Sequence, residues 1–171
     1  MELHEFTVVL NRCPDDDELD SLYEAGLDDT LPEIRHGHAV LHVARQAETL
    51  VDAILSVVAD IEKAGFQATG IESEDLVTLT DIAAKTGRCR ESVRLLATGK
   101  RGPGGFPAPL STGKHPLYSW ASVREWFCTN YGSDAVTPAN KDADTLAAAD
   151  LLLRARLLSP EAASLTGLVA A

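Results

Sequence analysis

A short segment rich in glycine and proline, residues 99–110, most constrains what this chain can fold into. Its sequence is GKRGPGGFPAPL, with four glycines and three prolines in twelve residues. Glycine costs conformational entropy in a helix and proline removes a hydrogen-bond donor, so this segment cannot be helical. The pattern predicts an extended arm that Phe106 and Leu110 anchor and that Pro107 and Pro109 stiffen. Amphipathic patterns on both sides predict that helices flank the arm.

The whole chain has the size and composition of an ordinary globular protein. Its 171 residues predict one domain or two small ones, and 45% of them are apolar and 24% charged, close to the average for soluble domains. No apolar run approaches the roughly 18 residues of a membrane helix, and the acidic N-terminus predicts no signal peptide. Cys13, Cys89 and Cys128 are scattered without a C-x-x-C pair, which predicts neither disulfides nor a zinc site. We therefore expect a cytoplasmic protein.

Charge is distributed unevenly along the chain. Residues 1–75 contain four Lys and Arg against eighteen Asp and Glu, whereas residues 76–127 contain eight against three. The net charge of −11 argues against unspecific binding of nucleic acid by the protein as a whole. A basic block inside an acidic chain instead predicts a nucleic-acid contact that is limited to one domain.

The first part, residues 1–75, alternates strand and helix patterns. Strand patterns lie at 5–10, 33–36, 39–43 and 66–71, with a tight turn expected at Gly37–His38. Helical patterns run from about Pro14 to Gly26 and from Ala47 to Ala64. This order predicts an α+β fold, with a ferredoxin-like β-α-β-β-α-β domain whose antiparallel sheet carries two helices on one face.

Two features of this first part resemble metal sites by residue type. We interpret His36, His38 and His42 as surface or edge histidines, because the expected turn separates them. The acidic run at residues 15–18 is explained by a helix N-terminus, where carboxylates are favourable. No metal site is predicted.

Residues 76–97 carry the pattern of two short helices joined by a turn. Thr78 or Thr80 can cap the first helix, and Gly87 can end it. In the second helix, residues 88–97, Val93 and Leu96 are spaced to pack against the first. A second helix with arginines at its start is typical of a helix-turn-helix with a recognition helix. The polar residues expected to contact DNA from these two helices are Thr80, Arg88, Arg90, Glu91, Ser92 and Arg94.

The arm is expected to continue into a wing. Residues 111–115 predict a turn and residues 117–120 a returning strand, which together with the arm give a β-hairpin. Lys100, Arg101 and Lys114 are expected to contact phosphates or the minor groove. A final helix at residues 121–127 presents apolar side chains to the core.

Three stretches of this region, LTDIAAKTGRCRESVRLL, GGFPAPL and LYSWASVREWF, resemble the winged helix-turn-helix of the MerR superfamily, especially its excisionase and AlpA-like members. In that family an F-P-x-P arm follows the helix-turn-helix, and a strand with an aromatic residue leads to a helix ending V-x-x-W-[LF]. The similarity covers about 50 residues, and the layout of the whole chain is similar to actinobacterial DNA-binding proteins. The resemblance implies DNA binding. The chain departs from the family in the longer link TGKRGPGG, an additional loop for the DNA backbone or a partner, and in lacking a long C-terminal coiled coil.

The third part, residues 128–171, is rich in leucine. A helix is predicted from about Asn140 to Leu158, and Ser159–Glu161 can start a further short helix. Its apolar residues are expected to pack against the rest of the chain or against a second subunit.

The leading hypothesis is a sequence-specific DNA-binding protein, a transcriptional regulator that acts as a homodimer held by residues 1–75 with help from the C-terminal helix. Two alternatives remain: an antitoxin or adaptor whose acidic domain binds a protein partner, and a recombination directionality factor. The basic helices can also be a small helical domain with solvated arginines. No nucleophile–base set, H-E-x-x-H or phosphate-binding loop is present, so neither an enzyme nor a cofactor is predicted.

Overall fold

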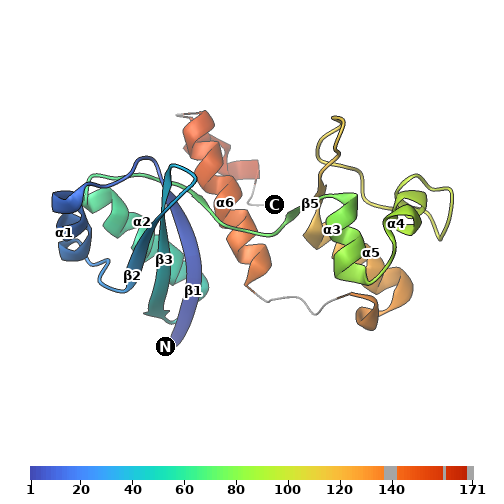
Figure 1. The fold of residues 1–171 in the computed structure, drawn as a ribbon, viewed down its shortest axis with the longest axis horizontal. Coiled ribbons are helices and arrows are strands. Elements are labelled where there is room, and N and C mark those ends of the chain that lie inside the picture. Colours follow the sequence, from blue (N-terminus) through green and yellow to red (C-terminus); the bar gives the residue numbers. More distant parts are fainter. Residues whose placement is uncertain (137–141, 160, 169–171) are drawn as a thin grey trace. The chain divides into compact units, whose positions relative to one another are not determined.

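The computed structural model describes residues 1–136, 142–159 and 161–168 of the chain. It divides into two compact units, one made of Met1–Glu72 with Thr145–Ala171 and the other of Ser73–Asp144. Helices and an antiparallel sheet are both present (Figure 1), so the predicted α+β class is confirmed. The division differs from the predicted three parts, because residues from Thr145 onward belong to the first unit and the segment before them belongs to the second.

The first unit contains a four-stranded antiparallel sheet with the strand order β2-β3-β1-β4. Its elements follow one another as predicted, strand, helix, strand, strand, helix, strand. They are β1 (Glu2–Leu10), α1 (Asp16–Glu24), β2 (Thr30–Arg35), β3 (His38–Ala47), α2 (Leu50–Lys63) and β4 (Ala68–Ile71).

Local signals decide where these elements begin and end. Asp15 and Glu18 form a capping box at the start of α1, with Asp15 Oδ1 accepting the Glu18 N–H at 2.9 Å. The predicted turn at Gly37–His38 lies one residue earlier, at His36–Gly37, where φ is +53° and +80°. Two consecutive positive φ values suit a two-residue hairpin between right-twisted strands.

The second predicted helix begins three residues later than expected. β3 continues to Ala47, and Thr49 caps α2 by accepting the Asp52 N–H. The predicted strand ends at residue 43, but the pairing of β3 with β1 extends it to Ala47, opposite Glu2.

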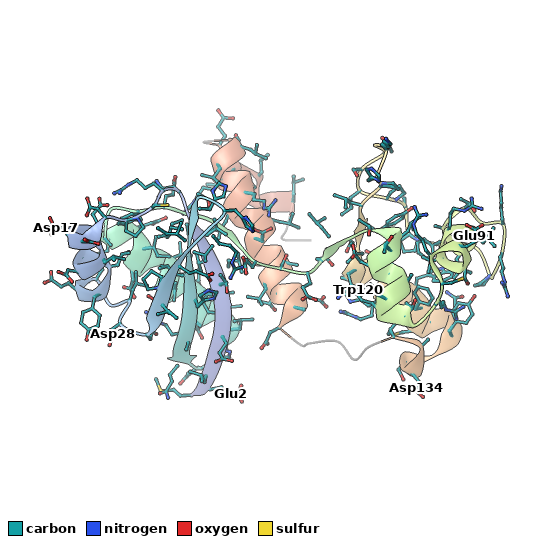
Figure 2. All side chains as sticks on the ribbon, in the orientation of Figure 1. Glu2, Asp17, Asp28, Glu91, Trp120 and Asp134 are labelled. Carbon is teal, nitrogen blue, oxygen red and sulfur yellow. The ribbon has the colours of Figure 1, made fainter. Side chains whose placement is uncertain are left out.

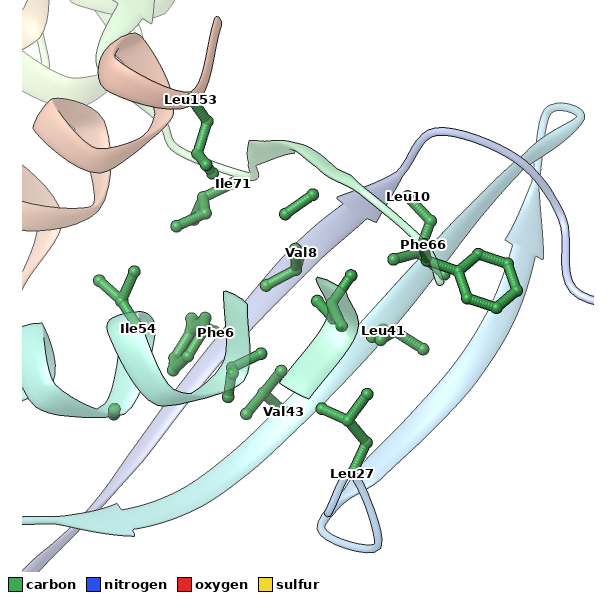
Figure 3. Packing of buried hydrophobic residues seen from close by; sticks show 14 of the residues in the cluster. Phe6, Val8, Leu10, Leu27, Leu41, Val43, Ile54, Phe66, Ile71 and Leu153 are labelled. Atoms are coloured by element: carbon green, nitrogen blue, oxygen red, sulfur yellow. The ribbon is translucent and has the colours of Figure 1, made fainter. Parts of the chain in front are cut away.

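One face of the sheet and the apolar face of α2 form the core of the first unit (Figure 3). Val8, Leu41, Val57 and Ile61 are fully buried there. Leu153 reaches the same cluster from α6 (Ala143–Leu158), far along the chain. The predicted start of this helix, near Asn140, and Pro160 in the next predicted helix lie outside the described residues; η2, a 3-10 helix, spans Ala162–Leu168.

Helix α6 packs along the free edge of β4. Asp150 Oδ1 accepts the Ile71 N–H at 2.9 Å, and Arg156 Nη2 donates to the Ala68 carbonyl at 3.3 Å. A Cβ on Gly70 would lie 2.7 Å from Asp150 Oδ1. The absence of a side chain at Gly70 therefore allows this close approach of helix and strand.

The second unit is built from short elements around an aromatic core. They are β5 (Leu76–Val77), α3 (Leu79–Thr86), α4 (Arg90–Ala97), β6 (Tyr118–Ser119), α5 (Trp120–Tyr131) and the 3-10 turn η1 (Ser133–Ala135). β5 and β6 form a two-stranded antiparallel sheet. Val93, Val123 and Phe127 are fully buried between the helices.

The predicted β-hairpin wing is wrong. The returning strand is only Tyr118–Ser119, it pairs with β5, and residues 106–110 form no strand. A single backbone hydrogen bond, from the Leu110 N–H to the Leu117 carbonyl at 2.7 Å, connects the two sides. Pro107 and Pro109 lack the N–H groups that a ladder requires. Trp120, expected in the strand, is the first residue of α5.

Within the described ranges, no helix combines the length and the apolar character that crossing a membrane would require.

Candidate nucleic-acid interface

The helix α3 is fixed at both ends by local contacts. Thr78 Oγ1 accepts the Asp81 N–H at 3.2 Å, and Asp81 Oδ2 accepts from the Thr78 N–H at 2.8 Å and from its hydroxyl at 2.6 Å. These bonds, chiefly the one from the Thr78 hydroxyl, lower the pKa of Asp81. Gly87 then ends the helix at a φ of +64°. Thr78 is therefore the cap, and the other candidate, Thr80, is an exposed residue of the first turn.

Helix α4 presents one buried and one exposed side. Val93 and Leu96 pack in the core with Ile82 of α3. Cys89 caps α4, because its Sγ accepts the Ser92 N–H at 3.4 Å. Arg90 and Glu91 are exposed at the first turn, and Ser92 is half-buried. This side of α4, with Glu91 pointing outward (Figure 2), is the one available to a ligand.

Two of the predicted contact residues bind each other. Arg94 Nε lies 2.8 Å from Glu91 Oε2, and Arg94 Nη2 lies 2.6 Å from Glu91 Oε1. The hydrogen bonds from Arg94 lower the pKa of Glu91, with smaller contributions from the charges of Arg90 and Lys100. The same ion pair raises the pKa of Arg94. Among the described residues, Arg90 is thus the arginine of α4 without an ion pair of its own.

Arg88 stands immediately before α4 and packs on aromatic rings. Its guanidinium carbon lies 4.5 Å from the centroid of Tyr131 and 5.5 Å from that of Phe127. A guanidinium over a ring face is attracted by the ring quadrupole. Arg88 therefore holds the start of α4 against α5, in addition to any contact with a ligand.

The loop at residues 98–105 is held tightly against the helices. The backbone N–H groups of Lys100 and Arg101 both donate to the Leu95 carbonyl, at 3.0 and 3.2 Å. Farther along, Trp126 Nε1 donates to the Gly104 carbonyl at 3.0 Å. A Cβ on Gly102, where φ is +86°, would lie 2.5 Å from Leu96 Cδ2. We call this segment the basic loop.

The anchor of the arm is Phe106 alone. Its ring makes edge contacts with Trp126 at 4.9 Å, Tyr118 at 5.8 Å and Phe127 at 6.3 Å between centroids. Leu110, the second predicted anchor, is 63% exposed. The prediction for Leu110 is wrong because the arm leaves the core after Pro107, so that residues 108–110 are exposed.

The predicted site residues thus fall into two places. Arg90, Glu91 and Arg94 lie together on α4, and the exposed Lys100 and Arg101 follow on the basic loop. Lys114, also exposed, belongs to the turn at residues 111–117, which projects from the unit on a different side from the basic loop (Figure 1). Lys114 is therefore not part of the surface formed by α4.

Sequence reasoning missed the residues that support this surface. The predicted final helix ends at residue 127, whereas α5 continues to Tyr131, whose ring lies 5.8 Å from those of Trp126 and Phe127 between centroids. The spacing of four between Phe127 and Tyr131 was an available signal, because such side chains share a helix face.

His36 and His38 are exposed, and His42 takes part in hydrogen bonds at the surface. His42 Nε2 lies 2.6 Å from Glu33 Oε2, and His42 Nδ1 lies 3.1 Å from Thr7 Oγ1. In the described part of the chain, no group of three or more His, Cys, Asp or Glu residues is placed to hold a metal ion.

Comparison with models of protein families, with curated proteins and with solved structures finds no match to this chain.

Proposed function

We propose that the second unit binds double-stranded DNA and that the protein is a cytoplasmic, sequence-specific regulator of transcription. The observation that carries this proposal is the concentration of charge on one helix and its following loop. Residues 88–105, which comprise the start of α4, α4 itself and the basic loop, contain five Lys and Arg and one acidic residue, Glu91. The apolar side of α4 is buried, so most of these charges face outward.

The fold assignments belong to the same proposal. For the first unit, the strand order β2-β3-β1-β4 with α1 and α2 between the strands supports a ferredoxin-like domain. For the second unit, α3, the turn at Gly87 and α4 support a helix-turn-helix of the MerR superfamily type. The wing would then be an arm without a strand ladder, fixed by Phe106.

The contacts support a division of labour among the basic residues. Arg90, exposed at the N-terminal end of α4, is the residue we assign to base edges in the major groove. Lys100 and Arg101 on the basic loop, and the exposed hydroxyl of Thr80, are assigned to phosphates. Arg88 and Arg94 position α4 and tune its charge, because each already has a protein partner.

The test is a binding measurement on the full chain. DNA fragments enriched from a random duplex pool are labelled, and binding is followed by fluorescence anisotropy. Replacement of a residue that contacts a base costs roughly 1–3 kcal/mol and relaxes specificity at that position, so Arg90→Ala weakens binding to the selected site by roughly tenfold or more. Lys63→Ala on α2 of the first unit removes the same charge and leaves affinity unchanged.

A second measurement separates phosphate contacts from base contacts. Lys100→Ala and Arg101→Ala weaken selected and random duplexes alike, and each reduces the slope of log affinity against log salt by about one. Failure to enrich any sequence, together with unchanged weak binding in all three variants, refutes the proposal.

A second candidate function rests on the acidic first unit. Residues 15–29 contain eight Asp and Glu and no Lys or Arg, a charge distribution that favours a basic protein partner. This candidate, an antitoxin or adaptor, predicts that the chain enriches no DNA sequence. A recombination directionality factor would enrich a sequence and bend it, which the mobility of circularly permuted fragments detects.

A further inference from the structure

We propose that a second copy of this chain docks on the outer face of α6, so that two α6 helices pair antiparallel about a two-fold axis. We call this surface the α6 stripe; it consists of Ala148, Leu151, Leu152, Ala155 and Leu158. The proposal does not depend on DNA binding, because every residue that carries it belongs to the first unit.

The α6 helix is apolar on two sides. Its inner side buries Leu153 in the core of the first unit and packs Leu146 and Ala149 against that core. On its outer side, Leu151 is 60% exposed, Leu152 54% and Leu158 86%. A helix with a second apolar side buries that side against a further partner. The residues of the α6 stripe recur at spacings of three and four, which places them along one line of the helix surface.

The β4 edge of the sheet is not available to a strand of a second copy. The Ile71 N–H is bonded to Asp150, and the Ala68 carbonyl is bonded to Arg156, both from α6. An incoming strand would have to displace these bonds and the helix itself. A free edge covered by a helix no longer pairs with another chain.

At the opposite edge of the sheet, the centre of β2 lacks a backbone N–H group that could donate to a strand of a second copy. The Ala44 N–H donates to the Asp29 carbonyl, so Asp29 and every second residue after it turn their backbone groups toward β3. Thr30, Pro32 and Ile34 therefore turn theirs toward the free edge. Pro32 has no N–H, and prolines at such positions block strand addition.

Charge also favours α6 over the rest of the first unit. Residues 1–72 contain sixteen Asp and Glu against four Lys and Arg. Helix α6 contains two arginines and two acids: Asp144, which pairs with Arg124 at 2.8 Å, and Asp150, which is buried and pairs with Arg154 at 2.9 Å. A dimer in which two copies of the acidic first unit meet at α6 therefore does not place carboxylates opposite one another.

The pattern of the α6 stripe is complementary to itself. From Ala148 to Ala155 its members read Ala, Leu, Leu, Ala in either direction. In an antiparallel pair centred between Leu151 and Leu152, leucine meets leucine and alanine meets alanine. A two-fold interface requires such a self-complementary patch. If residue i of one copy contacts residue j of the other, then residue j of the first copy contacts residue i of the other. This property favours a second copy over an unrelated protein.

The size of the α6 stripe predicts a weak dimer. A helix of sixteen residues is about 24 Å long and about 10 Å wide with its side chains. Its outer half therefore offers a few hundred Å², below the roughly 800 Å² per partner of a standard stable interface. We expect dimerisation that depends on concentration in the micromolar range.

The experiment is sedimentation equilibrium of the full chain from about 1 to about 200 μM. Wild-type protein is expected to pass from monomer to dimer over this range. Leu151→Glu and Leu152→Glu place a charge in the α6 stripe and should each weaken the dimer at least tenfold. Leu31→Glu is the matched control, because Leu31 is 68% exposed on β2, at the far edge of the same sheet; it should leave the dimer intact. Unchanged circular dichroism and melting temperature verify that the variants fold.

Three outcomes would overturn the proposal. The first is a monomer at every concentration, as expected if another part of the same chain covers the α6 stripe. The second is a dimer that survives both charged substitutions in α6. The third is a dimer that Leu31→Glu dissociates, which would place the interface on the sheet. In a double variant with Ala148→Cys and Ala155→Cys, disulfide-linked dimers joining 148 to 155 support the antiparallel direction, and links joining 148 to 148 contradict it.

Discussion

Glu91 and Arg94, one turn apart on the exposed side of α4, hold each other in a bidentate ion pair with contacts of 2.6 and 2.8 Å. The pair keeps a carboxylate in the middle of the surface that we assign to DNA. The carboxylate also binds Arg94, one of the two arginines that a spacing of four places on the same face of α4.

Removing this carboxylate should strengthen DNA binding. In Glu91→Gln, Arg94 loses its partner and becomes available to a phosphate, and one repulsive charge disappears. We expect higher affinity for selected and random duplexes alike, with the salt slope steeper by about one. Glu125→Gln, an equal change at an exposed position of α5, should leave both quantities unchanged. Weaker binding of Glu91→Gln in the anisotropy assay would instead mean that Glu91 itself contacts a base.

The close packing of the basic loop predicts a difference between two glycines. Gly102→Ala forces a Cβ to within 2.5 Å of Leu96 Cδ2 at a φ of +86°, and we expect a loss of about 2–3 kcal/mol in the free energy of unfolding. Gly104→Ala meets nothing within 4 Å at a φ of +79° and should cost about 1 kcal/mol, the backbone strain alone. Urea unfolding measures both; equal losses would contradict the packing of Gly102 on α4.

The aromatic anchor of the arm predicts a second contrast. Phe106→Ala removes a ring that contacts three others, and should lower the free energy of unfolding by about 3 kcal/mol. Leu110→Ala, at a position 63% exposed, should change it by less than about 0.5 kcal/mol. A comparable loss in the two variants would restore Leu110 as an anchor.

Asp150 holds α6 to the sheet, and its loss should destabilise the first unit. In Asp150→Ala the buried Ile71 N–H loses its acceptor, which costs about 1–3 kcal/mol. Arg154→Ala breaks the ion pair with Asp150, but Arg154 is largely exposed, so the loss should stay below about 1 kcal/mol. Hydrogen exchange of the Ile71 amide, faster in Asp150→Ala only, identifies the bond directly.

The capping box of α3 predicts a dependence on pH. Bonds from Thr78 lower the folded-state pKa of Asp81 below its ordinary value of 3.8, so their stabilisation is complete above that value and is lost as pH falls through the folded-state pKa. The urea midpoint of Asp81→Asn should therefore lie below that of wild type at pH 7, and the gap should close toward pH 2. Asp134→Asn, in η1, should show no gap at either pH. A gap that stays constant with pH would exclude the ionised carboxylate as its source.

The sequence by itself determined the elements that local chemistry specifies. Capping at Asp15 and Thr78, the glycine stop at Gly87 and the alternation of β1 depend on residues within a few positions of one another. These signals sufficed for the α+β class, the order of elements in the first unit and the placement of α3 and α4. They also placed Arg90 on the exposed side of α4, because Val93 and Leu96 define the buried side.

Only the tertiary structure decided which distant segments meet. Tyr118–Ser119 pairs with β5 rather than with the arm, and Asp75 fixes this choice by accepting the Trp120 N–H at 2.7 Å and, through its side chain, the Ala121 N–H at 2.8 Å. The leucines of α6 look alike in sequence, yet Leu153 is buried in the core and Leu146 packs against it, whereas Leu151, Leu152 and Leu158 are exposed. The bonds of Asp150 and Arg156 to β4 set this rotation of the helix. Pairing between distant segments depends on the shapes of packed elements and on backbone groups that are left unpaired once the chain has packed. Local sequence patterns therefore do not specify which distant segments pair.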